Sequence, residues 1–291
     1  MPSFDVPEVD YTRYSNRQLA GVPLAVLALA LLVLAAWYVL NGTPVSLGLE
    51  FTGGTELTLH ATSAQAASQG AVRQAFSTPA SSVQAIPSRA STYVATFGSG
   101  TNATALQNQA QAAGYEVVST TSTSATFGAQ SQRFALLGLL GSFVGMAIIV
   151  FVLFRSFVPS GAVVLSAFGD IVIPLALMNI FGIKLSLGTV AALLMLIGYS
   201  VDSDILLTNH VLRRSGSFYE SVDRAMKTGV TMTVTSLAAM AVMAVVAYAF
   251  GIELLTSIGL VLVFGLATDL MNTYMLNLSL LRWYKYEGVG R

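Results

Sequence analysis

The chain contains no cysteine, few charged residues and almost no histidine. Of its 291 residues, 10% are Asp, Glu, Lys or Arg, and two are His. The lack of cysteine excludes disulfide bonds, thiolate metal sites and a cysteine nucleophile. His60 and His210 are isolated, with no second ligand three or four residues away, so we expect no metal site. The sequence also lacks a P-loop, a Gly-x-Ser-x-Gly turn and a zinc signature, so we expect neither an enzyme nor a cofactor.

Apolar residues dominate the composition of the chain. Hydrophobic residues make up 54% of the chain, and its mean hydropathy is +0.70. These values are typical of an integral membrane protein rather than of a soluble domain. The formal net charge is zero, which gives no reason to expect a nucleic-acid partner.

Six apolar runs are long enough to cross a bilayer. The first, residues 19–40, has 22 residues, which is longer than the core of a signal peptide and predicts an uncleaved anchor. A polar segment, residues 1–18, precedes it, and residues 282–291 follow the last run. The predicted spans are residues 19–40, 134–154, 160–181, 185–207, 230–250 and 254–281. The last five form a predicted membrane bundle over residues 133–281.

Basic residues predict the orientation in the membrane. If both termini are cytoplasmic, only four of the 14 Lys and Arg residues fall outside the cytoplasm: Arg73, Arg89, Arg133 and Lys184. The other basic residues lie in the termini and short inner loops, as the positive-inside rule requires. We therefore expect a multi-pass protein of the cell membrane with both termini in the cytoplasm.

Residues 41–132 form a separate domain, which this orientation places outside the cytoplasm. Ser, Thr, Ala, Gln and Gly dominate its composition. Its periodicity predicts strands over residues 47–60, 82–97 and 115–127, and helices over residues 64–76 and 101–113. This pattern favours a small α+β domain with helices on one face of a sheet. Gly53 and Gly54 are expected at a turn or bulge that ends the first strand.

Four carboxylates lie within the predicted spans, with no Lys or Arg at a comparable depth. They are Asp170, Asp202, Asp204 and Asp269. A charged side chain near the bilayer centre costs about 3 kcal/mol on insertion scales, so such residues usually have a function. Burial disfavours the charged form, which suits these groups to gain and lose a proton. The alternative is that they only join helices by hydrogen bonds.

Asp202 and Asp204 cannot both face the same partner. Successive helix positions differ by about 100°, so these two side chains point about 200° apart. Asp204 has Ser200 one turn before it and Thr208 one turn after it, a continuous polar stripe. Asp202 has a less continuous stripe with Tyr199 and Asn209. We therefore rank Asp204 ahead of Asp202 as the working acid.

A segment with helical periodicity, residues 213–228, follows the fourth span. It predicts an amphipathic helix on the inner membrane surface that leads into the fifth span. Arg224 on its polar face is explained by positive-inside anchoring, and it could also extend towards the acids of the fourth span.

Three segments, in this order, resemble motifs of the SecF family of protein-export membrane proteins. They are GLEFTGGTEL (residues 48–57, with Gly53 and Gly54), IGYSVDSDILLT (residues 197–208, with Gly198 and Tyr199) and DRAMKTGVTMT (residues 223–233). The resemblance covers nearly the whole chain. Bacterial members read Gly-Tyr-Ser-x-Asn-Asp, which would place the key acid at Ser203. The Asp-Ser-Asp form resembles archaeal members and leaves Asp202 and Asp204 as alternatives.

The resemblance implies a role in protein export. The family is similar to half of a resistance-nodulation-division transporter, and its members pair with SecD. They use proton or sodium movement to assist translocation of a preprotein through the Sec channel. By resemblance, the fourth-span acids and Arg224 form the ion-coupling site, and the outer domain contacts SecD or the preprotein.

Two other functions remain open on sequence grounds. In one, the chain is a structural subunit that holds SecD and the channel together. Its buried acids would then be dispensable, whereas small residues on the span faces, such as Gly138, Gly141 and Gly145, would not. The other is a small-molecule transporter of the resistance-nodulation-division type, for which the outer domain is small.

Overall fold

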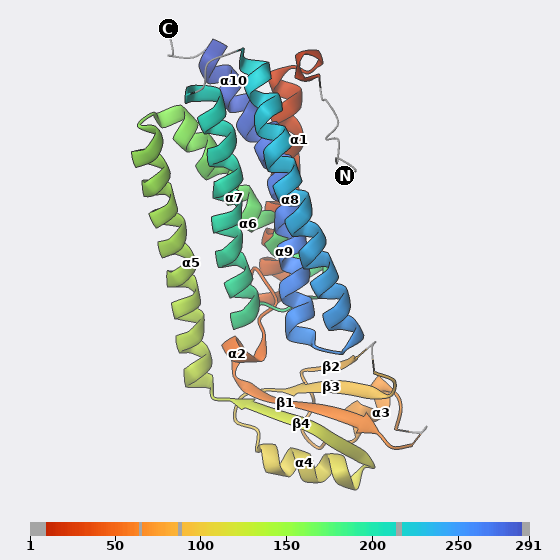
Figure 1. The fold of residues 1–291 in the computed structure, drawn as a ribbon. Helices are drawn as coiled ribbons and strands as arrows, with labels where there is room; N and C mark the ends of the chain where they lie inside the picture. The colour runs from red at the N-terminus through yellow and green to blue at the C-terminus, as the bar shows by residue number, and fades with distance from the viewer. Residues whose placement is uncertain (1–9, 64–65, 87–88, 214–216, 287–291) are drawn as a thin grey trace.

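Six long helices run side by side in the computed structural model, and a small sheet lies at one end of them (Figure 1). The structure describes residues 10–63, 66–86, 89–213 and 217–286. In chain order, its elements are η1 (Tyr11–Arg13), α1 (Asn16–Asn41), α2 (Leu49–Thr52), β1 (Gly54–Ala61), α3 (Gln69–Gln74), β2 (Ser82–Ala85), β3 (Thr92–Phe97), α4 (Ala103–Ala112), β4 (Tyr115–Thr123), α5 (Ala125–Phe154), α6 (Phe157–Phe181), α7 (Leu187–Arg213), α8 (Phe218–Ala249), α9 (Glu253–Met271), η2 (Asn272–Asn277) and α10 (Leu278–Tyr286). The predicted fold class, six membrane helices with a small α+β domain between the first and second, is confirmed.

Capping residues explain where several of the long helices begin and end. Ser15 and Gln18 form a reciprocal capping box at the start of α1, and Ser124 accepts a hydrogen bond from a backbone N–H at the start of α5. Gly42 and Gly182 end α1 and α6 with positive φ angles of 76° and 70°. These polar caps bound helices whose interiors are almost wholly apolar.

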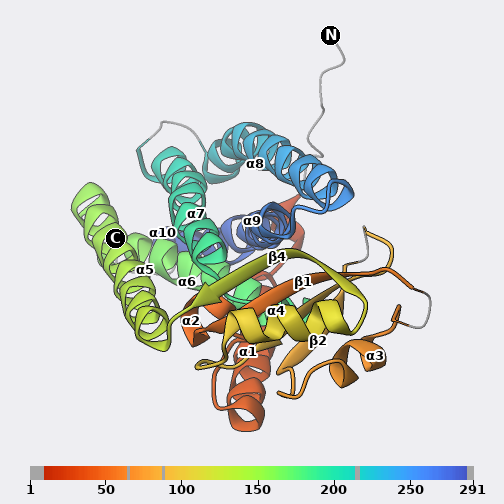
Figure 2. The same cartoon turned by 90° about the horizontal axis from the view of Figure 1, so that it is seen from below.

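The bundle has three central helices and three peripheral ones. Over the 18-residue apolar stretch of α6 that could cross a membrane, 67% of the residues are buried, against 11% over the corresponding stretch of α5. Helices α6, α7 and the continuous helix α9–η2–α10 form the centre, and α1, α5 and α8 lie at the periphery (Figures 1 and 2). Helix α1 begins and α10 ends at the end of the bundle opposite the sheet (Figure 1). The polar chemistry of the bundle is therefore concentrated in α6, α7 and α9.

The amphipathic segment differs from its prediction. Its described part from Phe218 onwards is the first section of α8 and continues directly into the fifth span, rather than forming a separate surface helix. The predicted apolar face is buried against α7, η2 and α10, through Phe218, Val222, Ala225 and Met226. Residues 214–216 lie outside the described residues.

The outer domain is a four-stranded antiparallel sheet in the order β2-β3-β1-β4. Alternate side chains of β1 and β3, including Leu57 and Phe97, point to one face. Helices α3 and α4 cover that face through Val72, Leu106 and Ala110, so the prediction of helices on one face of the sheet is confirmed. The opposite face is turned towards the bundle, and α4 lies below the sheet in Figure 1 and in front of it in Figure 2, on the side away from the bundle.

Several predicted element boundaries in this domain were wrong. The strand expected over residues 47–60 begins only at Gly54, because residues 49–52 form α2. The strand expected over residues 82–97 is two strands, β2 and β3, which pair with each other. The strand expected to reach residue 127 ends at Thr123, where Ser124 caps α5. Helix α3 is shorter than the predicted helix, whose residues 64–65 lie outside the described residues.

The Gly53–Gly54 pair lies at the start of β1 instead of at the end of a strand: Gly53 ends α2 and Gly54 is the first residue of β1. Gly53 has φ 69° and ψ 167°, a conformation that is essentially restricted to glycine. Gly54 has φ 130°, and a Cβ atom there would collide with the carbonyl oxygen of Phe97. The pair therefore lets the chain leave α2 and enter the sheet at once.

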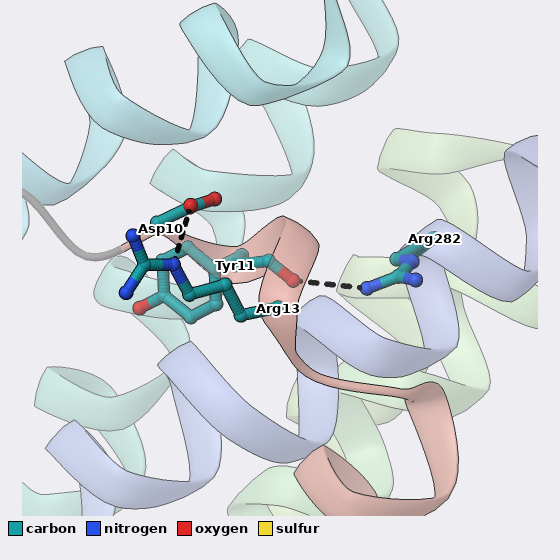
Figure 3. A network of polar contacts seen from close by, with 4 residues as sticks. All are labelled: Asp10, Tyr11, Arg13 and Arg282. Atoms are coloured by element: carbon teal, nitrogen blue, oxygen red, sulfur yellow. Dashed lines mark hydrogen bonds and ion pairs between the residues drawn. The ribbon is translucent and has the colours of Figure 1, made fainter.

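The first described residues are fastened to the last helix. Arg282 donates a hydrogen bond through Nη1 to the carbonyl oxygen of Tyr11 (3.2 Å), and Asp10 pairs with Arg13 at 3.0 Å (Figure 3). The same Nη1 atom also donates to the carbonyl oxygen of Tyr14 at 2.8 Å. The Tyr11 side chain is buried with residues of α7, α8 and α10. Burial raises the pKa of Tyr11 to about 12, so its hydroxyl stays neutral. The start of the described chain is thus part of the packed end of the bundle.

A cleft of about 570 Å³, lined by both apolar and charged side chains, separates the inner face of the sheet from the bundle. Glu50, Glu56 and Glu253 line it together with Lys184. Burial raises the pKa of the Glu56 carboxyl, with Lys184 opposing the shift and Glu253 and Glu50 adding to it. The cleft therefore holds a carboxylate whose charge destabilises the docked domain.

We expect Gly54→Ala to destabilise the outer domain by about 3 kcal/mol or more, because it combines an unfavourable φ angle with a clash against the backbone of β3. Thermal unfolding and limited proteolysis of the purified protein would measure the loss. Gly98→Ala is the matched control, since a Cβ atom at Gly98 meets nothing within 4 Å among the described residues. Equal stability of the two variants would contradict this account.

We expect Glu56→Gln to raise the unfolding temperature of the protein at neutral pH. Below the ordinary Glu pKa of 4.5, Glu56 is protonated in both the folded and unfolded states and has no effect. As the pH rises through the raised pKa of the folded state, the charged form destabilises the folded domain. The gain should therefore disappear in acid, and a gain of the same size at both pH values would show that charge is not its cause.

A buried carboxylate cluster as the candidate functional site

Three central helices bring three carboxylates together inside the bundle. Asp170 lies on α6, Asp204 on α7 and Asp269 on α9, and their exposed fractions are 1%, 0% and 2%. Asp170 lies within electrostatic range of both other acids. The sequence predicted all three as site residues, and the structure places them in one cluster.

Neutral side chains hold Asp170 on both of its oxygens. Ser200 of α7 donates to Oδ2 at 2.5 Å, and Asn272 of η2 donates to Oδ1 at 2.7 Å. Ser200 was predicted as part of a stripe around Asp204, and the structure instead directs its hydroxyl across to α6. These bonds join all three central helices at the level of Asp170.

A single threonine links the other two acids. The hydroxyl of Thr273 lies 2.9 Å from Oδ1 of Asp204 and 3.2 Å from Oδ1 of Asp269. Ser203 of α7 donates to the same oxygen of Asp269 at 2.7 Å, and Asn277 donates through Nδ2 to Oδ1 of Asp204 at 2.8 Å. The donors to the cluster are thus serine, threonine and asparagine.

The π-helical segment η2 explains how one helix supplies three of these donors. Asn272 and Asn277 are five positions apart, which an α-helix would place about 140° apart. A π turn closes over five residues, so both side chains reach the cluster. Such turns occur frequently at functional sites.

Asp204 differs from the other two acids in its second oxygen. Within the described part of the chain, Oδ2 of Asp204 is buried and makes no well-formed hydrogen bond, and the same holds for Oγ1 of Thr208, Oγ of Ser166 and Oδ1 of Asn277. Ser166 lies beside the Asp204 carboxylate, and Thr208 follows one helical turn later on α7. Buried polar atoms without partners are rare in folded proteins, so this group can accept a proton, a cation or water.

The chemistry of the cluster is suited to exchange of a small cation. Three carboxylates close together in a low-dielectric bundle carry charge only at a high cost, because burial and mutual repulsion both penalise it. Within the described ranges, no set of three or more His, Cys, Asp or Glu residues has the arrangement of a metal site.

Apolar side chains fill the bundle between the carboxylates and the outer domain. Buried residues of α6, α7 and α9 form this layer: Met178, Leu193, Leu196, Val261, Leu262 and Leu266. Leu196 packs so closely on Gly265 that a Cβ atom there would overlap the leucine side chain. The unpartnered hydroxyl of Thr208 lies on the other side of the cluster, towards α10.

The remaining residues of the fourth-span motif face away from the cluster. Asp202, Gly198 and Tyr199 are exposed on α7, and Tyr199 has an exposed fraction of 43%. This placement agrees with the angular separation expected between Asp202 and Asp204. Their predicted roles as site residues stay predictions.

Arg224 lies at the start of α8 and not among the buried acids. Its guanidinium forms an ion pair with Glu220, one turn earlier on the same helix, at 3.7 Å, and its side chain is 44% exposed. This pair runs along the surface of α8 and does not point into the bundle interior. The part of Arg224 in ion coupling stays a prediction.

The sequence analysis missed Ser166, Asn272, Thr273 and Asn277, and named Ser203 only as the place of the bacterial acid. The sequence held a usable signal for most of them, but polar neighbours at helical spacing were considered only for Asp202 and Asp204. Ser166 lies four positions before Asp170, and Asn272 and Thr273 lie three and four positions after Asp269. Asn277 could not have been found in this way, since it reaches the cluster only through the π turn.

Two family models match the chain. The model of "Protein export membrane protein SecD/SecF, C-terminal" matches residues 102–287, and that of the "SecD/SecF GG Motif" matches residues 38–65, which include Gly53 and Gly54. The chain is also 65% identical to "Protein-export membrane protein SecF" of Haloferax volcanii and 62% identical to that of Haloquadratum walsbyi, each over the whole of both chains. A protein of the same name from Methanolacinia petrolearia is 43% identical over 96% of this chain and 97% of its own.

A solved structure shares the fold. The crystal structure of SecDF, a translocon-associated membrane protein from Thermus thermophilus, matches 96% of this chain with a TM-score of 0.76 and 20% identity. The chain spans 39% of that larger protein. With the family models and the full-length relatives, these findings show that the chain belongs to the SecD/SecF family of protein-export membrane proteins.

Proposed function

We propose that this chain is a subunit of the Sec protein-export machinery that works with SecD and uses proton or sodium movement to assist preprotein translocation. Its relatives are named as protein-export membrane proteins, and the structural neighbour joins SecD and SecF in one protein. The observation that carries the ion-coupling part is Oδ2 of Asp204, which is buried, makes no well-formed hydrogen bond within the described chain and has the Ser166 hydroxyl beside it.

The proposed orientation follows the positive-inside rule. Both termini lie in the cytoplasm, and the sheet domain lies outside, where it can contact SecD, the Sec channel or the emerging preprotein. At the end of the bundle opposite the sheet, where α1 begins and α10 ends, the helix ends are rich in basic residues. This supports contact with lipid headgroups there. No part of this proposal requires nucleic acid or an enzymatic reaction.

The proposed coupling step is a change in what occupies Asp204. Because Oδ1 already accepts two hydrogen bonds, a proton or cation would bind at Oδ2. Binding there would remove the negative charge that draws Thr273 and Asn277 towards α7. The contact between α7 and η2 would then weaken, and α7 could move relative to η2. This movement is the proposed link between ion binding and the rest of the chain.

A second candidate is a structural subunit that holds SecD without moving ions. It is favoured by one observation on α5, the least buried of the spans: a Cβ atom added at Gly138, Gly141 or Gly145 would meet no described atom within 4 Å. A flat glycine face of this kind suits close packing against a helix of another chain. The third possibility, a small-molecule transporter, has no comparable support.

We expect Asp204→Asn to lower secretion of a reporter protein about tenfold, within the usual range of coupling between two sites. Asn keeps an oxygen that can accept from Thr273 and Asn277, but it cannot exchange a proton or hold a cation charge. Asp202→Asn is the matched control, because Asp202 is exposed on the same helix. Membrane levels and copurification with SecD must be equal in both variants.

The same assay separates the two candidates. Normal secretion by Asp204→Asn would overturn ion coupling through this residue. If Gly141→Leu then reduced both secretion and copurification with SecD, the structural subunit would be the better account.

A further inference from the structure

The four-residue helix α2 lies where the outer domain meets the bundle. It precedes the Gly53–Gly54 turn into β1, and its Glu50 reaches the start of α7. The Oε2 atom of Glu50 accepts a hydrogen bond from the backbone N–H of Leu187 at 2.5 Å. A side chain of the outer part of the chain thus caps the helix that carries Asp204.

This cap adds to one that α7 already has. Ser186 and Thr189 cap each other's backbone N–H groups at the first turn, at 3.2 Å and 2.8 Å. Glu50 satisfies the N–H of Leu187, which they leave free, and its negative charge complements the positive end of the helix dipole. Because α7 has its own capping pair, Glu50 is not required for the helix to form.

The segment before α2 is hydrogen-bonded to the loop between α6 and α7. The backbone of Gly48 donates to Leu185 (2.7 Å), and the backbone of Leu185 donates to Ser46 (2.7 Å), which makes a short parallel bridge. At the end of α6, the Asn179 side chain accepts from the Ser46 N–H (3.1 Å) and donates to the Pro44 carbonyl (2.8 Å). We call these bonds, together with the Glu50 cap, the α2 joint.

The other side of α2 packs on α5, which continues from the sheet. A Cβ atom at Gly128 would lie 2.7 Å from the carbonyl oxygen of Phe51, and one at Gly53 would lie 2.8 Å from Cα of Ala125. Backbone therefore meets backbone with no side chain between them. Helix α2 is thus held by the start of α7, the end of α6 and the start of α5 together.

Away from this joint, the sheet is weakly attached to the bundle. The cleft of about 570 Å³ lies between them, with Glu56 and Gln84 of the sheet and Tyr248 and Glu253 of the bundle in its lining. Across it, among the described residues, Lys184 reaches Ser82 at 3.5 Å, which is long for a hydrogen bond. The outer domain is therefore fixed to the bundle at one side and separated from it by the cleft at the other.

Both helices that end at the joint carry the carboxylate cluster. Helix α6 carries Asp170 and ends near Asn179, and α7 begins at Leu187 and carries Asp204. A rise of 1.5 Å per residue places Asp204 about 26 Å from Leu187 along a rigid helix. A shift of α7 at the cluster must therefore appear at its capped end.

We propose that the α2 joint transmits movement of α7 to the outer domain, with Glu50 as the positioning residue that fastens the two. This inference rests on the proposed function, since it assigns a route for the movement that ion exchange at Asp204 starts. A change at the cluster moves α7, Glu50 moves with the N-terminus of α7, and the sheet rocks across the cleft.

The test compares Glu50→Ala with Glu253→Ala in the complete complex with SecD. Glu253 is a matched control, because it is also acidic, lies in the first turn of α9 and lines the same cleft. We expect Glu50→Ala to lower secretion about tenfold, the factor that corresponds to one charge-assisted hydrogen bond. Ion movement in vesicles that contain the complex should stay at the parental level, because the cluster is untouched.

A covalent link supplies the second arm of the test. The natural chain has no cysteine, so Leu47→Cys with Leu185→Cys would form a single defined disulfide between the two bridge partners. We expect its oxidation to restore secretion in the Glu50→Ala background and to leave secretion unchanged in the parent. A merely stabilising role for Glu50 would reduce protein level and ion movement as well as secretion.

Each other outcome decides against the inference. Normal secretion by Glu50→Ala, with Asp204→Asn still defective, would overturn the joint but leave ion coupling intact. Loss of ion movement in Glu50→Ala would show that Glu50 supports the cluster rather than the transmission. If the disulfide blocked secretion in the parent, the joint would have to open during the cycle, contrary to the proposal.

Discussion

The buried carboxylate of Asp204, which accepts two hydrogen bonds at Oδ1 and has only the Ser166 hydroxyl beside it as a further donor, is the constraint on which the rest of the bundle depends. A buried acid is tolerated only if its surroundings supply donors, and in this cluster they are serine, threonine and asparagine side chains of α7 and η2. The π turn of η2 is needed because an α-helix cannot direct both Asn272 and Asn277 to the same place. The central helices are thus held in register by polar contacts at one level.

The same helices connect this level to the outer domain. Between the cluster and that domain, a layer of apolar side chains packs α6, α7 and α9 tightly together. The end of α6 and the start of α7 are hydrogen-bonded to the α2 joint, and backbone contacts at Gly53 and Gly128 join α2 directly to α5. The conformation of Gly53 and Gly54 makes this close junction possible, which gives the GG motif a physical reason. The carboxylate cluster and the outer domain are therefore joined by one continuous set of contacts.

The sequence predicted the parts of this arrangement that depend on composition and period. Six apolar runs, the polar domain between the first two, and the buried acids Asp170, Asp204 and Asp269 all follow from the cost of placing polar groups in lipid. The boundaries near α2 could not be predicted, because the strand-like run from residue 47 is overridden by tertiary contacts with α5 and α7. Asn277 could not be predicted for a different reason, since α-helical spacing does not describe a π turn. The exposed position of Arg224 likewise depends on packing that no local pattern encodes.

Ion movement through the complete complex with SecD in sealed vesicles tests the central claim most directly. Proton-sensitive and sodium-sensitive dyes would follow entry of each ion while a preprotein is translocated. The account predicts entry of one ion in the parent and in Asp202→Asn, and its loss in Asp204→Asn at equal protein levels. Equal entry of that ion in the parent and in Asp204→Asn would contradict it, and would leave the buried acids as contacts that only hold the helices together.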